Sequence, residues 1–149
     1  MISASRSTTG YAFLHSGSVV AYRSKTQSLM ATSSTKAEFI AAVSSGKVAK
    51  YLRSILLQIG FQQLLPTPIC EDNESTIKMT NTDRLTERSC HIDIQYFTIQ
   101  DWKKAEHIIL HKIPGIINPS NALTKAVCWI LHSRHVRHML GHFGFRSGL

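Results

Sequence analysis

A segment with helical periodicity, residues 33–60, constrains the fold more than any other feature, because strand patterns stand on both sides of it. Hydroxyl side chains that can cap a helix begin the segment at Ser33, and Gly60 ends it. Between these two residues, apolar side chains recur with the spacing of one helix face. They are Ala37, Ile40, Ala41, Val48, Leu52, Ile55, Leu56 and Ile59. The pattern predicts one long helix in the first half of the chain.

The rest of the chain alternates between strand and helix patterns. The expected strands are residues 11–16, 19–23, 69–70 and 108–113, and the further expected helices are residues 75–80, 92–102 and 119–127. The first two strands flank Gly17 and predict a hairpin, because glycine suits the tight turn. Strands interleaved with helices after a hairpin predict an α/β fold, in which helices flank a mixed sheet.

The composition predicts one globular domain over residues 1–149. With 43% hydrophobic and 17% charged residues, the chain has the composition of a folded protein and not of a disordered one. No apolar stretch approaches the length of a membrane helix, and the N-terminus lacks a signal-peptide pattern, so we expect an intracellular protein. Residues 132–149 are basic, rich in histidine and interrupted by glycine, and are expected to form a loose tail.

The charge balance indicates a polyanionic partner. Seventeen Lys and Arg residues against nine Asp and Glu residues give a formal net charge of +8. Such a balance favours nucleic acid, with acidic lipid as the alternative, through contacts with phosphate. Arg134, Arg137 and Arg146 could follow a phosphate backbone, although a solvated tail explains them equally well.

Cysteine, histidine and tryptophan give weaker signals. The three cysteines form no CxxC pair, which favours reduced thiols. Cys128 and His132 are spaced to place two ligands on one helix face, but no second pair completes a zinc site. Trp102 and Trp129 are expected to pack in the core or between helices and not to stack on bases.

Two carboxylates stand where an α/β fold places its functional sites. Glu38 lies within the expected long helix, and Asp72 follows the Ile69-Cys70 strand. Because sites form at the carboxyl ends of such strands, a helix crossing that end would bring Glu38 close to Asp72. Two neighbouring carboxylates bind a hard cation such as Mg²⁺. The alternative for either residue alone is a solvated surface acid.

Six short strings resemble, in order and spacing, the ribonuclease H domain at the end of copia-type retrotransposon polyproteins. They are RSTTGY (6–11), SKTQ (24–27), SSTKAEF (33–39), EDN (71–73), RSCHID (88–93) and ALTK (122–125). The resemblance covers about residues 6–142, and six ordered motifs are far more specific than any single one. It implies a ribonuclease H-like fold, a five-stranded mixed sheet with helices on both faces, that cuts RNA in an RNA–DNA hybrid during reverse transcription.

The resemblance also implies a metal site with four acidic ligands, and this sequence has an acidic residue at two of the four positions. Members of the family hold two Mg²⁺ ions with four acidic residues, one ion activating the attacking water and the other stabilising the leaving oxygen. Glu38 matches the second acid and Asp72 the third, whereas the fourth falls on Asn121. The first belongs upstream of Arg6, where residues 1–5 contain no acid. The resemblance therefore implies a truncated or degenerate domain, with Mg²⁺ as its cofactor.

The absent first acid would lie on the central strand of the sheet, between the hairpin and the Ile69-Cys70 strand. We expect that strand to be missing, which leaves two strand edges facing a gap unless another segment supplies it. The resemblance further implies nucleic-acid contacts at Arg88, His91 and Lys125. The first two of these residues precede a helix, whose N-terminus favours phosphate.

The implied partners are an RNA–DNA hybrid or another nucleic acid, together with an upstream reverse transcriptase segment. The implied location is the cytoplasm, a retroelement particle or the nucleus. Two alternatives stay open beside a degenerate nuclease. One is a non-catalytic module that binds nucleic acid or another partner, and the other is a gene-model fragment without an independent function.

Overall fold

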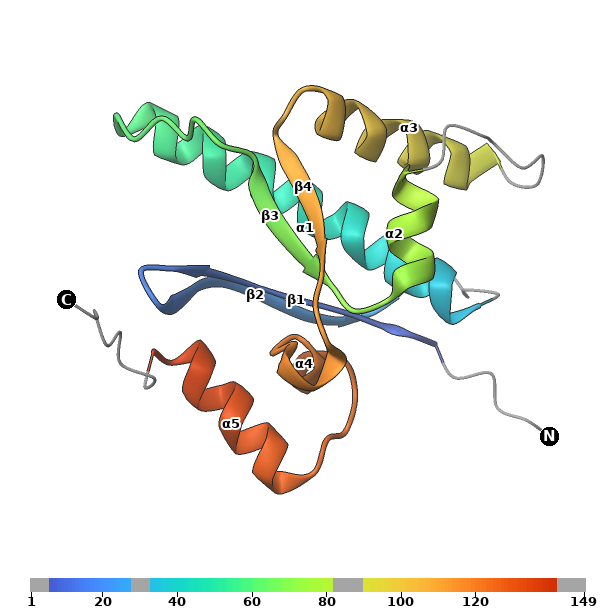
Figure 1. Ribbon diagram of the computed structural model, residues 1–149, viewed down its shortest axis with the longest axis vertical. Coiled ribbons are helices and arrows are strands. Elements are labelled where there is room, and N and C mark those ends of the chain that lie inside the picture. Colours follow the sequence, from blue (N-terminus) through green and yellow to red (C-terminus); the bar gives the residue numbers. More distant parts are fainter. Residues whose placement is uncertain (1–5, 28–32, 82–89, 142–149) are drawn as a thin grey trace. The chain divides into compact units, whose positions relative to one another are not determined.

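The computed structural model describes residues 6–27, 33–81 and 90–141, without the side chains of residues 90–93. Its strands are β1 (Thr8–His15), β2 (Ser18–Thr26), β3 (Thr67–Glu71) and β4 (Ile108–Lys112). Its helices are α1 (Ser34–Gln58), α2 (Glu74–Asn81), α3 (Cys90–Lys104), the short 3₁₀ helix η1 (Gly115–Ile117), α4 (Asn121–Thr124) and α5 (Trp129–Met139) (Figure 1). The expected α/β class is confirmed. None of the described helices is long and apolar enough to cross a membrane.

The chain divides into two compact units. The first unit combines residues 1–37 with residues 114–149, and the second consists of residues 38–113. Where the sequence predicts one mixed sheet, the described strands form two sheets, an antiparallel β1–β2 pair in the first unit and a parallel β3–β4 pair in the second. Each strand therefore has one hydrogen-bonded neighbour, and each sheet has two edges.

The first unit is built on the β1–β2 hairpin. Ser16 and Gly17 form its turn with φ of 51° and 83°, the pair of positive angles that suits the twist of a hairpin. Helix α4 packs on β1 where Gly10 leaves no room for a side chain, because an added Cβ would collide with Thr124. Ser24 of β2 donates a hydrogen bond to the Leu123 carbonyl at 2.6 Å. The hairpin is therefore attached to α4 through both of its strands.

Gln27 connects the hairpin to the start of α1. Its buried side chain donates through Nε2 to Thr9 Oγ1 at 3.0 Å and to the Ala37 carbonyl at 2.9 Å. Its backbone N–H donates to the Ser7 carbonyl at 2.8 Å. Three hydrogen bonds from one residue thus join β1, the end of β2 and the first turn of the long helix.

The second unit packs α1 against the parallel pair and α3. Strands β3 and β4 run side by side from Thr67, which faces Ile108, to the end of both strands (Figure 1). A Cβ added at Gly46 of α1 would lie 2.7 Å from the indole of Trp102 and 3.5 Å from the side chain of Ile108. Phe39 and Ile99 are fully buried in the same unit. The absence of a side chain at Gly46 allows α1 and α3 to approach closely.

An arginine organises the connection between α1 and β3. Arg53 donates to the carbonyls of Leu65 and Gln63, both at 2.7 Å, and to Thr67 Oγ1 at 3.2 Å. Gly60 ends the helix with φ of 88°, as the sequence predicts. The guanidinium therefore orders the loop and sets the position at which β3 begins.

The C-terminal part differs most from the sequence prediction. The helix expected over residues 119–127 is only the four-residue α4, because Lys125 takes an extended conformation (φ −147°, ψ 157°). A separate helix, α5, follows and includes residues 132–139, which were expected in a loose tail. Residues 142–149 lie outside the described residues. Trp102 packs as expected, but the packed position predicted for Trp129 is wrong, since 79% of that residue is exposed.

The close approach at Gly46 predicts that Gly46→Val destabilises the protein. A Cβ there would lie 2.7 Å from the indole of Trp102, and such overpacking costs about 1–3 kcal/mol. Thermal unfolding should show a lower Tm for Gly46→Val than for Lys47→Val, which places the same β-branched residue at the next, exposed position. Equal losses in both variants would contradict the packing argument.

Candidate functional site

Three carboxylates gather at the end of β3 in the second unit. Glu38 is the fifth residue of α1, Glu71 is the last residue of β3, and Asp72 directly follows it. The start of α1 is set by Ser33, whose Oγ accepts a hydrogen bond from the Lys36 N–H at 3.2 Å and so caps the helix. This cap fixes the helical register and with it the position of Glu38, one turn further on.

Glu71 is the buried member of this group, with 7% of its surface exposed. Burial, and to a smaller degree the negative charges of Glu38 and Asp72, raise the pKa of Glu71 to about 7. The Asn73 N–H acts in the opposite direction, because it donates to Glu71 Oε1 at 2.9 Å. Since both other carboxylates act on Glu71, the structure brings Glu38 and the end of β3 within electrostatic range of each other.

Lys112 supplies a positive charge at the same place. It faces Glu71 in the parallel register of β3 and β4, and its ammonium group donates to the Asp72 carbonyl at 2.7 Å. Its charge also adds to that of Lys78 in lowering the pKa of Glu74. The sequence prediction did not include Glu71 or Lys112. Glu71 could have been found because it alternates with Ile69 and so lies on the same face of the strand. Lys112 could have been found from the pairing of the two parallel strands.

The carboxylates do not form a ready metal cage. In the part of the chain that the structure describes, no three His, Cys, Asp or Glu side chains lie close enough together to hold an ion. Carboxylate oxygens are the ligands that Mg²⁺ prefers, and a pair of Mg²⁺ ions needs several of them. The donor set of Glu38 and Asp72 therefore does not fit two Mg²⁺ ions.

Asn121, at the position that corresponds to the fourth acid, belongs to the first unit and serves its local structure. It is buried at the start of α4, and its Nδ2 donates to the Gly115 carbonyl at 2.6 Å. This bond joins α4 to the preceding 3₁₀ helix. A carboxylate at this position could not donate it, so the amide has a structural role that an aspartate would not reproduce.

The predicted nucleic-acid residues are described only in part. Arg88 lies outside the described residues, and His91 belongs to α3 but its side chain is not among those described. Lys125 is exposed directly after α4, and its N–H donates to the Asn121 carbonyl at 3.1 Å. The structure therefore presents Lys125 to solvent, and its contact with nucleic acid stays a prediction.

The weaker zinc hypothesis gains no support from the described residues. Cys128 is exposed and precedes α5, and the ring of His132 stacks on Trp129 with 6.4 Å between ring centroids. Neither residue belongs to a group of three candidate ligands within the described ranges. The histidines of α5 are therefore better treated as part of a basic helix.

Comparison with known proteins relates the chain to a retroelement protein. No protein-family model and no solved structure match the chain. The retrovirus-related Pol polyprotein from transposon TNT 1-94 of Nicotiana tabacum is 35% identical over 122 residues, which is 82% of this chain. The chain is similar to part of a retrotransposon Pol polyprotein. It spans 9% of that relative's length, and the similarity supports a retrotransposon Pol origin.

The buried carboxylate of this retroelement-derived chain predicts a pH-dependent stability. The folded pKa of Glu71, about 7, lies above its ordinary value of 4.5, so the folded state binds more protons between these values. Stability should therefore fall as pH rises from about 4.5 to 8, by on the order of 3 kcal/mol from this residue. Glu71→Gln, which is neutral throughout, should remove this contribution and be more stable than the parent at pH 8.

Urea unfolding of both proteins at several pH values measures the difference. Asp101→Asn, which removes an exposed carboxylate of the same unit, serves as the control and should follow the parent. Parallel curves for the parent and Glu71→Gln would contradict the argument from burial.

Proposed function

We propose that this chain is a ribonuclease H-like domain of retrotransposon Pol origin that binds RNA–DNA hybrids but, in its present form, does not cleave them. The observation that carries the proposal is the cluster of three carboxylates, Glu38, Glu71 and Asp72, at the end of β3. Glu38 and Asp72 both act on the buried Glu71, while no three His, Cys, Asp or Glu residues among those described are placed to hold a metal ion. We assign Glu38 and Asp72 to two of the four acids of the resembled site.

The order of the elements supports the fold. The resemblance implies a hairpin, a long helix that carries one acid, and a strand that ends at a second acid. The chain has these parts in this order, as the β1–β2 hairpin, α1 with Glu38, and β3 followed by Asp72. The similarity to a Pol polyprotein over 82% of the chain agrees with this interpretation.

The edges of the described strands leave room for a further strand. In the resembled fold, a central strand with the first acid pairs with the hairpin on one side and with the strand before the third acid on the other. Among the described strands, β1 pairs only with β2 and β3 pairs only with β4. Each therefore has an edge that can take a further strand, whose unpaired backbone groups are costly if buried.

Hybrid binding without cleavage follows from the charges. A net charge of +8 supplies phosphate contacts, and affinity that rests on such contacts falls steeply with salt. Cleavage by two Mg²⁺ ions requires ligands for both ions, one of which activates a water molecule. Glu38 and Asp72 alone supply too little negative charge for two dications.

A set of four proteins tests the proposal. They are the parent, Asn121→Asp, a fusion with an upstream segment of about ten residues that carries an aspartate in a strand pattern, and the two changes combined. Each is assayed for Tm, binding and Mg²⁺-dependent cleavage of a labelled RNA–DNA hybrid. The parent should bind in a salt-dependent manner without cleavage above background.

The expected results separate the effect of Asn121 from the effect of the added upstream strand. Asn121→Asp alone should lower the Tm, because it removes the bond to the Gly115 carbonyl, and should restore no activity. The fusion should raise the Tm whichever residue occupies position 121. Only the combined protein should cleave, and Glu38→Gln in that protein should abolish cleavage.

Two outcomes would contradict the proposal. Robust cleavage by the parent that disappears in Glu38→Gln would show that the site is already complete. A folded combined protein that neither binds nor cleaves the hybrid would refute the ribonuclease H-like interpretation.

A further inference from the structure

The charges of the chain are divided unequally between its two units. The first unit contains eight of the seventeen Lys and Arg residues and none of the nine Asp and Glu residues. The second unit contains nine of each kind, so the entire formal charge of +8 belongs to the first unit. No basic side chain of the first unit has a carboxylate side chain of its own unit to pair with. Such a surface is complementary to a polyanion.

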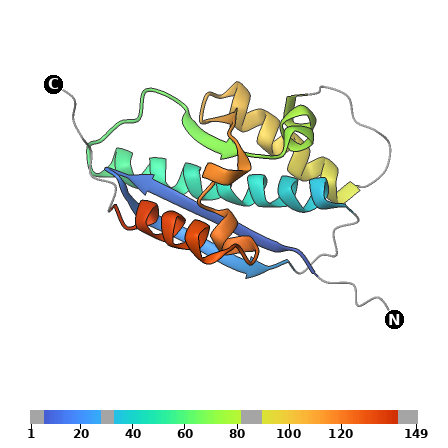
Figure 2. The same ribbon diagram turned by 60° about the horizontal axis from the view of Figure 1, so that its bottom comes forward.

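Helix α5 presents part of this charge on a defined face. Its inner side lies along the hairpin, next to β2, and His135 on that side is only 2% exposed (Figure 2). Trp129, Ile130, Arg134 and Arg137 are exposed on the helix. The spacing from residue 130 to 134 and on to 137 places Ile130, Arg134 and Arg137 along one face, away from the buried His135, and Trp129 lies about 100° round the helix from Ile130. The Cα atoms of Arg134 and Arg137 are about 4.5 Å apart along the helix axis.

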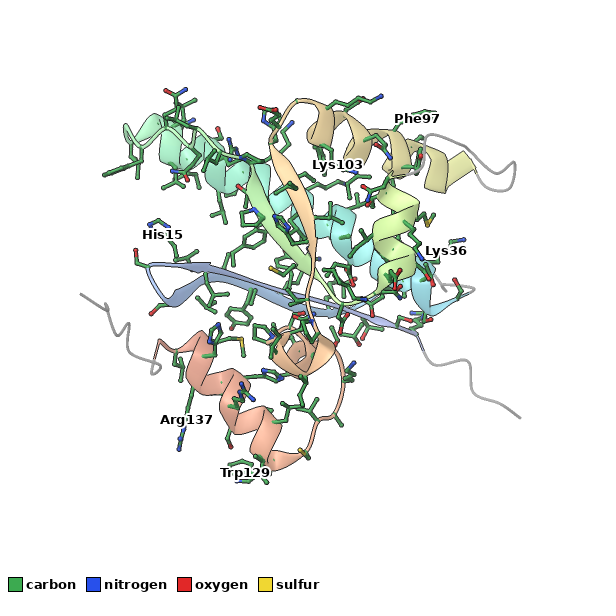
Figure 3. All side chains as sticks on the ribbon, viewed as in Figure 1. His15, Lys36, Phe97, Lys103, Trp129 and Arg137 are labelled. Atoms are coloured by element: carbon green, nitrogen blue, oxygen red, sulfur yellow. The ribbon has the colours of Figure 1, made fainter. Side chains whose placement is uncertain are left out.

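Trp129 adds a flat aromatic surface at the beginning of the same helix. It is 79% exposed, and the imidazole of His132 stacks on the indole with an angle of 19° between the rings. In Figure 3 the side chains of Trp129 and Arg137 both project away from the helix. With one indole face against His132 and most of its surface exposed, the other face is open to a further planar group. Burial of a tryptophan in the core, the ordinary role of this residue, is absent here.

We propose that this face of α5 binds single-stranded nucleic acid, with Arg134 and Arg137 on phosphates and Trp129 stacked on an unpaired base. An exposed indole next to basic side chains is the combination that binds single strands without reading their sequence. A paired base inside a duplex is already stacked on its neighbours and offers no face to the indole. This surface contains none of the three clustered carboxylates, Glu38, Glu71 and Asp72, so the inference does not depend on the proposed function.

An acidic lipid surface is the competing polyanion, and the arrangement of α5 speaks against it. A helix that lies in a membrane interface turns a continuous apolar face outward. Here the exposed apolar residues stand at the two ends of the helix, Trp129 and Ile130 at its start and Leu140 directly after it. The exposed Arg134 and Arg137 lie between these ends and interrupt an apolar face.

Fluorescence anisotropy with a labelled 12-nucleotide oligouridylate, with a blunt RNA–DNA hybrid as the duplex probe, tests the proposal on the full chain. Trp129→Ala should weaken binding of the single strand about tenfold and binding of the duplex less than twofold. Trp129→Phe should retain most of the affinity. Because the residue is exposed, both variants should keep the parent Tm.

The arginines are tested through the salt dependence. Arg134→Gln with Arg137→Gln should weaken single-strand binding and reduce the slope of log K against log salt by about 1.4, the loss of two phosphate contacts. The matched control is Lys47→Gln with Lys104→Gln, which removes two exposed charges from the second unit. The control should change the affinity less than twofold.

Each other result would overturn the proposal. Equal weakening by the lysine control would show that net charge alone is responsible. An unchanged affinity in Trp129→Ala, or an equal loss for single strand and duplex, would rule out stacking on an unpaired base. Binding to vesicles that contain phosphatidylserine, without binding to the oligouridylate, would assign the face to an acidic lipid surface.

Discussion

Burial of the Glu71 carboxylate beside those of Glu38 and Asp72 is the constraint on which the candidate site depends. Glu71 is buried at the end of β3, and the charges of Glu38 and Asp72 add to the effect of burial in raising its pKa. Hydrogen bonds from the backbone N–H groups of Asn73 and Asp72 to the Glu71 carboxylate act in the opposite direction and lower its pKa. A group of this kind attracts a cation, but its few ligands limit it to a weak site. The proposal of a domain that does not cleave follows from this balance.

The uneven division of charge gives the two units different chemistry. All nine acidic residues lie in the second unit, which contains the cluster of three carboxylates. The charged side chains of the first unit are all Lys or Arg. The two surfaces differ in the ligands that they favour, because a basic surface attracts phosphates and carboxylates attract cations. The retrotransposon Pol origin that the comparison supports agrees with this division.

Much of the fold could be predicted from the sequence, because its periodic segments are long. The helix expected over residues 33–60 is α1 at Ser34–Gln58, and the Ile69-Cys70 strand lies within β3. Helix α5 was missed, since the break at Lys125 depends on a backbone conformation that no local pattern indicates. Glu71 was missed for a related reason: its burial depends on which face of a short strand is covered. The roles of Glu38 and Asp72 as metal ligands stay a prediction.

The central claim is that the cluster of Glu38, Glu71 and Asp72 cannot hold a pair of Mg²⁺ ions. Calorimetric titration of the chain with Mg²⁺ tests this claim most directly. Glu38→Gln and Asp72→Asn serve as reference proteins in the same titration. The account predicts at most one ion, bound with a Kd of about 1 mM or weaker, and a loss of this binding in both variants. Two ions bound well below that concentration, and lost in Glu38→Gln, would contradict it.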